Sequence, residues 1–145
     1  MGQANSAGAM AVGAVRYVNT PAFGNNSPFI ESFSSIGGTP VSGVVRNKPD
    51  FTAPDGVNTT VNFNSLNVEG DGFPNFFGTS AAAPHAAGVA ALILQAEKKF
   101  SNLVLSPAQM RSLLQRTALN MGEPGFDFQS GAGLINAQAA LATFA

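Results

Sequence analysis

The sequence contains no cysteine among its 145 residues, so disulfide bonds and thiolate metal sites are excluded. Charge is also scarce, because Asp, Glu, Lys and Arg together make up only 10% of the residues. The seven basic residues form no run that would follow a nucleic-acid backbone. We therefore expect no nucleic-acid partner. The low charge, with abundant Gly, Asn, Ser and Thr, is a weak indication of a secreted protein.

Long hydrophobic runs are missing as well. The longest apolar stretch, Ala86–Leu94, includes Gly88 and falls far short of the roughly 20 residues that a membrane span needs. This stretch is typical of a buried helix, and we expect no membrane partner. The first residues, Met1–Asn5, lack the basic residues that begin a secretion signal. If the parent protein is secreted, we expect its targeting segment to lie outside this sequence.

Hydrophobic residues nevertheless make up 45% of the chain, enough for one domain with a sizeable core. Segments with strand-like patterns come first, at residues 11–18, Phe51–Ala53 and Thr59–Phe63. A long helix is predicted over Thr79–Lys98, and its first half is rich in alanine. Strands that precede helices in this way predict an α/β fold.

Two further helices are predicted by the residues that begin them. Ser106 can cap a first turn, Pro107 suits the first helical position, and Gln109 completes a capping box. A last helix follows Asn136, because apolar residues then recur on one side. A Gly-rich connection over residues 121–133 separates these two helices.

The segment with the clearest chemistry is Gly78–Gly88, whose sequence is GTSAAAPHAAG. Ser80 lies where a loop becomes a helix, and the first N–H groups of a helix have no partner within it. These groups and the helix dipole would stabilise an oxyanion formed beside Ser80. Gly78 lets the backbone pass close to a substrate. A short Gly-Thr-Ser string by itself is more often a simple helix cap, so the alternative to a catalytic role is that Ser80 only caps the helix.

The whole segment resembles the nucleophile signature of the subtilisin-like serine proteases, the subtilases. The resemblance continues in the family's order from about residue 11 to residue 144. The further matching segments are residues 11–15, 32–37, 48–54, 91–94 and 131–140. The long loop at residues 19–31 and Asp55 differ from the compact members, which usually have Gly at the position of Asp55.

This resemblance implies that residues 1–145 are one partial domain, the C-terminal half of a catalytic domain. The fold would be α/β, half of a three-layer domain with a parallel sheet, with Ser80 at the N-terminus of a central buried helix. The implied reaction is hydrolysis of a polypeptide by acyl transfer, with Ser80 as the catalytic nucleophile. No cofactor is required, although calcium often stabilises relatives. The parent would be secreted or attached to the cell surface.

The family's other catalytic residues are missing from this sequence. It contains no Asp-Ser-Gly, Asp-Thr-Gly or His-Gly-Thr motif, and its only histidine is His85. Five residues along a helix correspond to about 140° of rotation and roughly 7.5 Å of rise, so His85 cannot serve Ser80 as its base. The resemblance likewise implies a supporting position for His85. We expect the catalytic His and Asp in the missing N-terminal half of the same domain.

The isolated chain should therefore be inactive, and it should self-associate because truncation leaves apolar surface and a strand edge uncovered. Two other functional classes stay open at this point: a pseudo-protease that serves as a binding scaffold, and a helical interaction module. Glu69 and Asp71 could hold a hard cation, but two carboxylates in a polar loop are more often only solvated. Phe76 and Phe77 either line the substrate cleft or anchor the loop before Gly78.

Overall fold

The computed structural model describes residues 2–62 and 66–144. Its sheet consists of two parallel strands, β1 (Val12–Arg16) and β2 (Phe51–Asp55), paired from Val12 opposite Phe51 to Arg16 opposite Asp55. Within the described residues three α-helices follow: α1 (Thr79–Phe100), α2 (Pro107–Arg116) and α3 (Ala137–Leu141). Short 3₁₀ turns lie at η1 (Gln3–Asn5), η2 (Tyr17–Asn19), η3 (Pro21–Phe23) and η4 (Ala142–Phe144). The chain is therefore α/β with its strands before its helices, as predicted.

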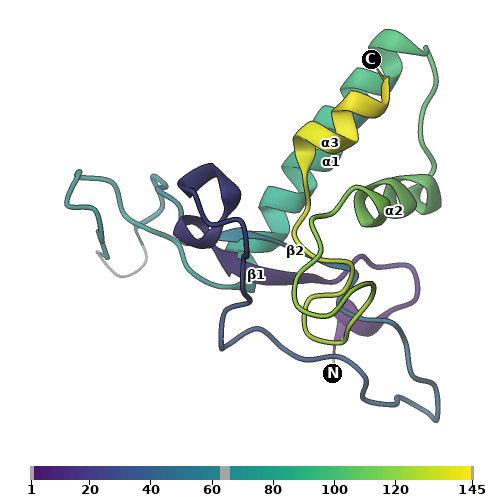
Figure 1. Cartoon of the computed structure of the whole chain (residues 1–145), viewed down its shortest axis with the longest axis horizontal. Coiled ribbons are helices and arrows are strands. Elements are labelled where there is room, and N and C mark those ends of the chain that lie inside the picture. Colours follow the sequence, from purple (N-terminus) through teal and green to yellow (C-terminus); the bar gives the residue numbers. More distant parts are fainter. Residues whose placement is uncertain (1, 63–65, 145) are drawn as a thin grey trace.

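The core lies where α1 crosses the two strands, and α3 runs alongside α1 (Figure 1). Small residues at the start of α1, Ala82 and Ala86, let the helix approach the strands closely. The remaining buried members of this core come from both strands, the helices and the segment before α3. They are Ala14, Phe51, Ala53, Ile93, Met110, Leu113, Leu114, Ile135 and Ala140.

Two of the predicted strands form, and the third does not. The strand predicted at residues 11–18 ends at Arg16 because the chain turns into η2, while the strand predicted at Phe51–Ala53 extends to Asp55. The strand predicted over Thr59–Phe63 is wrong for residues 59–62, and Phe63 lies outside the described residues. Val61 is 45% exposed, so this alternating pattern has no core on which to pack.

The predicted helix starts are confirmed. Ser106 Oγ accepts from the backbone N–H of Gln109 at 3.3 Å, and Gln109 Oε1 accepts from the N–H of Ser106 at 2.8 Å. Asn136 Oδ1 accepts from the N–H of Ala139 at 2.9 Å and caps α3. These bonds join residues only three apart, which is why the local sequence predicts them.

A buried ion-pair cluster joins the starts of both strands to α2. Asp50 is 3% exposed, and its Oδ2 accepts from Lys48 Nζ and from the N–H of Ala11, both at 2.7 Å. Its Oδ1 lies 3.2 Å from Nε of Arg111 in α2. Arg111 also donates to the carbonyl of Ala9 at 2.9 Å. Asp50 thus holds together segments that are distant in the sequence.

The described part of the chain has no helix that is both long enough and apolar enough to cross a lipid bilayer.

Candidate active site around Ser80

Ser80 is the second residue of α1, and its side chain is exposed. The N-cap position belongs to Gly78, whose φ of 123° is a backbone conformation that other residues rarely adopt. The carbonyl of Gly78 accepts from the N–H groups of Ala81 and Ala82, at 2.9 and 3.1 Å. No group in residues 2–62 and 66–144 accepts a hydrogen bond from the N–H of Ser80. Ser80 therefore presents a hydroxyl and a free N–H at the positive end of a helix, and it is not the cap.

The turn that precedes Ser80 is joined to the chain segment that follows β2. The N–H of Gly56 donates to the carbonyl of Phe76 at 2.9 Å, and the N–H of Phe76 donates to the carbonyl of Val57 at 3.1 Å. The N–H of Gly78 donates to Oδ2 of Asp55 at 2.8 Å. The hydrogen bonds of Phe76 and Gly78 thus help to set the path of the backbone into α1.

Phe77 anchors this turn, which is one of the two roles considered for it. Its ring lies with its centroid 5.4 Å from Cζ of Arg16. A Cβ added at Gly56 would come within 2.4 Å of the same ring, so the ring packs directly on the Gly56 backbone. Phe76 is half-buried and lines a groove of about 510 Å³ that also borders Ala81 of α1.

Asp55 is the most unusual group near Ser80, because its carboxylate is fully buried at 0% exposure. Burial raises its pKa above the ordinary value, against the opposing effects of the Gly78 hydrogen bond and the charges of Arg16 and His85. Burial, followed by the charge of Asp55, also raises the pKa of Glu31, while Arg16 opposes this shift. Strand pairing, together with the start of α1, thus gathers four charged or titratable groups behind the Ser80 turn.

His85 is engaged by its own helix. Its Nδ1 lies 2.9 Å from the carbonyl of Ala81, one helical turn earlier, so Nδ1 carries the proton and donates it. The side chain is half-buried. This contact agrees with the supporting role predicted for His85 and leaves the base for Ser80 to come from elsewhere.

Comparison with known proteins agrees with the family resemblance found in the sequence. The family model described as the subtilase family matches residues 2–133 of this chain. The chain belongs to the subtilase family. It is 44% identical over 92 residues to alkaline elastase YaB of Bacillus sp. (strain YaB). That alignment covers 63% of this chain and 20% of the elastase. The chain is 36% identical over 137 residues to M-protease of Shouchella clausii (strain KSM-K16). That alignment covers 94% of this chain and 28% of M-protease.

The fold is similar to that of solved subtilase structures. The crystal structure of fervidolysin from Fervidobacterium pennivorans, a keratinolytic enzyme related to subtilisin, superposes with a TM-score of 0.63 at 31% identity. The match covers 97% of this chain and 20% of that one. The chain thus has part of a subtilisin-like α/β domain, as the resemblance implied, and spans a minor part of the length of these relatives.

Glu69 and Asp71, the two carboxylates considered for a hard cation, lie in the loop between β2 and α1. Asp71 uses its carboxylate within the loop, where Oδ1 accepts from the N–H of Phe73 at 2.9 Å and Oδ2 accepts from Nδ2 of Asn58. Glu69 is exposed. Residues 2–62 and 66–144 contain no group of three or more His, Asp or Glu side chains that could hold a metal ion. Calcium therefore stays an untested prediction for this family member.

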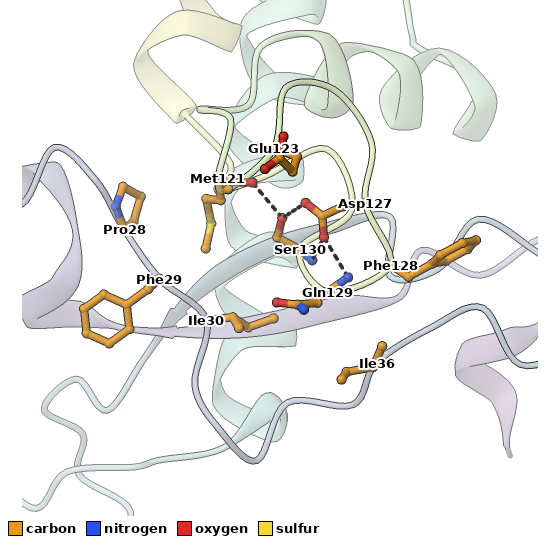
Figure 2. Close-up of a pocket in the computed structure, with 11 residues that line it drawn as sticks. Pro28, Phe29, Ile30, Ile36, Met121, Glu123, Asp127, Phe128, Gln129 and Ser130 are labelled. Carbon is orange, nitrogen blue, oxygen red and sulfur yellow. Dashed lines mark hydrogen bonds between the residues drawn. The ribbon is translucent and has the colours of Figure 1, made fainter.

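A second cavity of about 510 Å³ lies beside the loop that precedes α3 (Figure 2). Ser130 and Asp127 point toward each other there, and the Ser130 hydroxyl donates to Oδ2 of Asp127 at 2.7 Å. Although burial opposes it, hydrogen bonds from Ser130 and from the N–H of Gln129 lower the pKa of Asp127. This Ser–Asp pair closes a turn of the loop, and it lacks the base that a nucleophilic serine needs.

Sequence reasoning located Ser80 and His85 but missed the charged groups around them. Asp55 was noted only as a departure from the compact subtilases, and neither Arg16 nor Glu31 was singled out. The available signal was the position of Asp55 at the end of a buried strand and directly before Gly56, where a charged residue needs partners.

Proposed function

We propose that the protein containing this chain is a serine endopeptidase in which Ser80 is the nucleophile. The observation that carries the proposal is the exposed Ser80 hydroxyl beside an N–H group that has no acceptor in the described part of the chain. In this mechanism Ser80 Oγ bonds to the peptide carbonyl carbon while a base removes its proton. The carbonyl oxygen becomes an oxyanion next to the Ser80 N–H. The C–N bond then breaks, the base returns its proton to the leaving amine, and water later hydrolyses the acyl-enzyme.

The base and its orienting carboxylate would come from the N-terminal half of the same domain. His85 donates to Ala81 and is the only histidine in the sequence, so this chain has no imidazole to offer Ser80. The missing half would also supply most of the substrate-binding surface. Membership of the subtilase family supports this arrangement, and it supports a secreted or cell-surface location in the same way.

A fluorophosphonate, which phosphonylates activated serines with loss of fluoride, tests the proposal directly. In the full-length protein we expect a single modified peptide, with the label on Ser80 by mass spectrometry. His85→Ala should keep the label, and the chain of residues 1–145 by itself should take none because it lacks a base. A folded full-length protein that is not labelled would instead indicate a pseudo-protease, and a label on another serine would exclude Ser80 as the nucleophile.

The isolated chain is also expected to self-associate, and exposed apolar surface is the stronger of the two reasons given for it. The outer edge of β1 is partly covered, because the N–H of Glu31 donates to the carbonyl of Ala14 and Ser34 Oγ accepts from the N–H of Ala14. Large apolar side chains on α1 are exposed instead, including Leu92 at 52% and Phe100 at 64%. We propose that the N-terminal half of the domain covers them in the full protein.

Light scattering on the isolated chain measures this association. We expect a dimer or larger species that Leu92→Glu shifts toward the monomer, because a charge on the α1 surface opposes burial. Val68→Glu is the matched control, since Val68 is 48% exposed on the loop before α1. A chain that stays monomeric at high concentration and binds no apolar dye would contradict this proposal, because the apolar side chains of α1 would then not drive association.

A further inference from the structure

The turn before Ser80 depends on one side chain for its last hydrogen bond. Phe76 forms hydrogen bonds with Gly56 and Val57 through backbone groups, but the N–H of Gly78 donates to Oδ2 of Asp55 at 2.8 Å. The two residues are 23 apart in sequence. Gly78 lies two residues before Ser80, and it is the N-cap from which α1 starts. The acceptor on Asp55 thus acts on the backbone that carries the nucleophile.

Charged and titratable groups surround the Asp55 carboxylate. Arg16 lies directly opposite it in the strand register, and the guanidinium of Arg16 lies against the Phe77 ring at 5.4 Å. Glu31 approaches from the loop after η3, and His85 from α1. In the described residues, Oδ1 of Asp55 is buried without a hydrogen-bond partner. Apart from the backbone of Asp55 itself, the N–H of Gly78 is therefore the only group there that donates a hydrogen bond to this carboxylate.

Burial works against a charged carboxylate at the position of Asp55. Burial raises the pKa of Asp55, so the folded chain binds the proton more tightly than the unfolded chain does. Its contribution to stability therefore falls as the pH rises from the unfolded pKa through the folded pKa. The charge-assisted hydrogen bond from Gly78 acts in the opposite direction and favours the ionised carboxylate.

We infer that Asp55 is a positioning residue for Ser80. Its Oδ2 holds the Gly78 N–H and thereby sets where α1 begins, which places the Ser80 hydroxyl and N–H relative to the substrate carbonyl. Asp55 does not touch the reacting atoms and acts only through the backbone. The inference rests on the proposed function, since it gives Asp55 a role in the same acyl transfer.

Two substitutions of similar shape isolate the hydrogen bond. Asp55→Asn keeps an oxygen that accepts from Gly78, whereas Asp55→Leu fills the same space without an acceptor. In the full-length protein we expect Asp55→Leu to lower kcat by about 100-fold, the cost of a small misplacement of reacting groups. KM should stay within about threefold, because the substrate-binding surface is unchanged. Asp55→Asn should recover most of kcat, and Glu123→Ala, which removes an exposed carboxylate, should behave like wild type.

Titration of active sites with the fluorophosphonate makes the comparison independent of folding yield, because kcat is then given per competent molecule. The inference is overturned if Asp55→Leu keeps the wild-type kcat per site, or if Asp55→Asn and Asp55→Leu lose equal amounts. A loss confined to KM would also overturn it. Turnover that survives Ser80→Ala would overturn the proposed function together with this inference. A dead Ser80→Ala variant beside a fully active Asp55→Leu variant would overturn this inference alone.

Discussion

Ser80→Ala is expected to lower the kcat of the full-length protein by about a millionfold, the usual effect of removing the nucleophile from a catalytic triad. The change removes one oxygen from an exposed position, and Ala is a good helix former, so the fold should be unaffected. Hydrolysis of a peptide substrate measures the loss, and the thermal unfolding midpoint should match that of wild type.

His85→Ala is the comparison that gives this result its meaning. It removes the hydrogen bond from Nδ1 to the Ala81 carbonyl, so it should lower stability while leaving measurable turnover. If both variants fold normally and His85→Ala is the inactive one, the assignment of the nucleophile and of the supporting residue is reversed.

Asp50→Ala is expected to lower the free energy of unfolding by about 3–5 kcal/mol, the cost of removing one partner from a buried ion pair. Lys48 is only 8% exposed, and without Asp50 its ammonium group would stay buried with no opposite charge. The N–H of Ala11 would lose its acceptor at the start of β1. Denaturation of the full-length protein in urea measures the loss.

Two variants bracket this effect. Asp50→Asn keeps an acceptor for the Ala11 N–H but removes the charge, so it should fall between wild type and Asp50→Ala. Asp71→Ala removes an exposed carboxylate and should cost less than about 1 kcal/mol. Equal stability of Asp50→Ala and Asp71→Ala would mean that the cluster does not hold the strands to α2.

The sequence by itself determined the features that depend on neighbouring residues. Ser106 and Gln109 form their capping box across three positions, and Asn136 caps α3 over the same distance. The segment that begins at Gly78 likewise identified the helix start at Thr79 and the family of the chain. Such features need few residues and no partner from a distant part of the chain, so a local pattern is enough to find them.

Only the tertiary structure decided which patterns find a partner. The alternation at residues 59–62 resembles a strand, yet it forms none because no core lies beside it. Asp55 is separated by 23 residues from Gly78, and Asp50 by 39 from Ala11, so neither bond can be read from nearby residues. Parallel pairing brings Arg16 opposite Asp55, and α1 then packs against both strands. The charged groups behind Ser80 therefore exist only once the strands have paired, because strand register, and not sequence distance, sets which side chains meet.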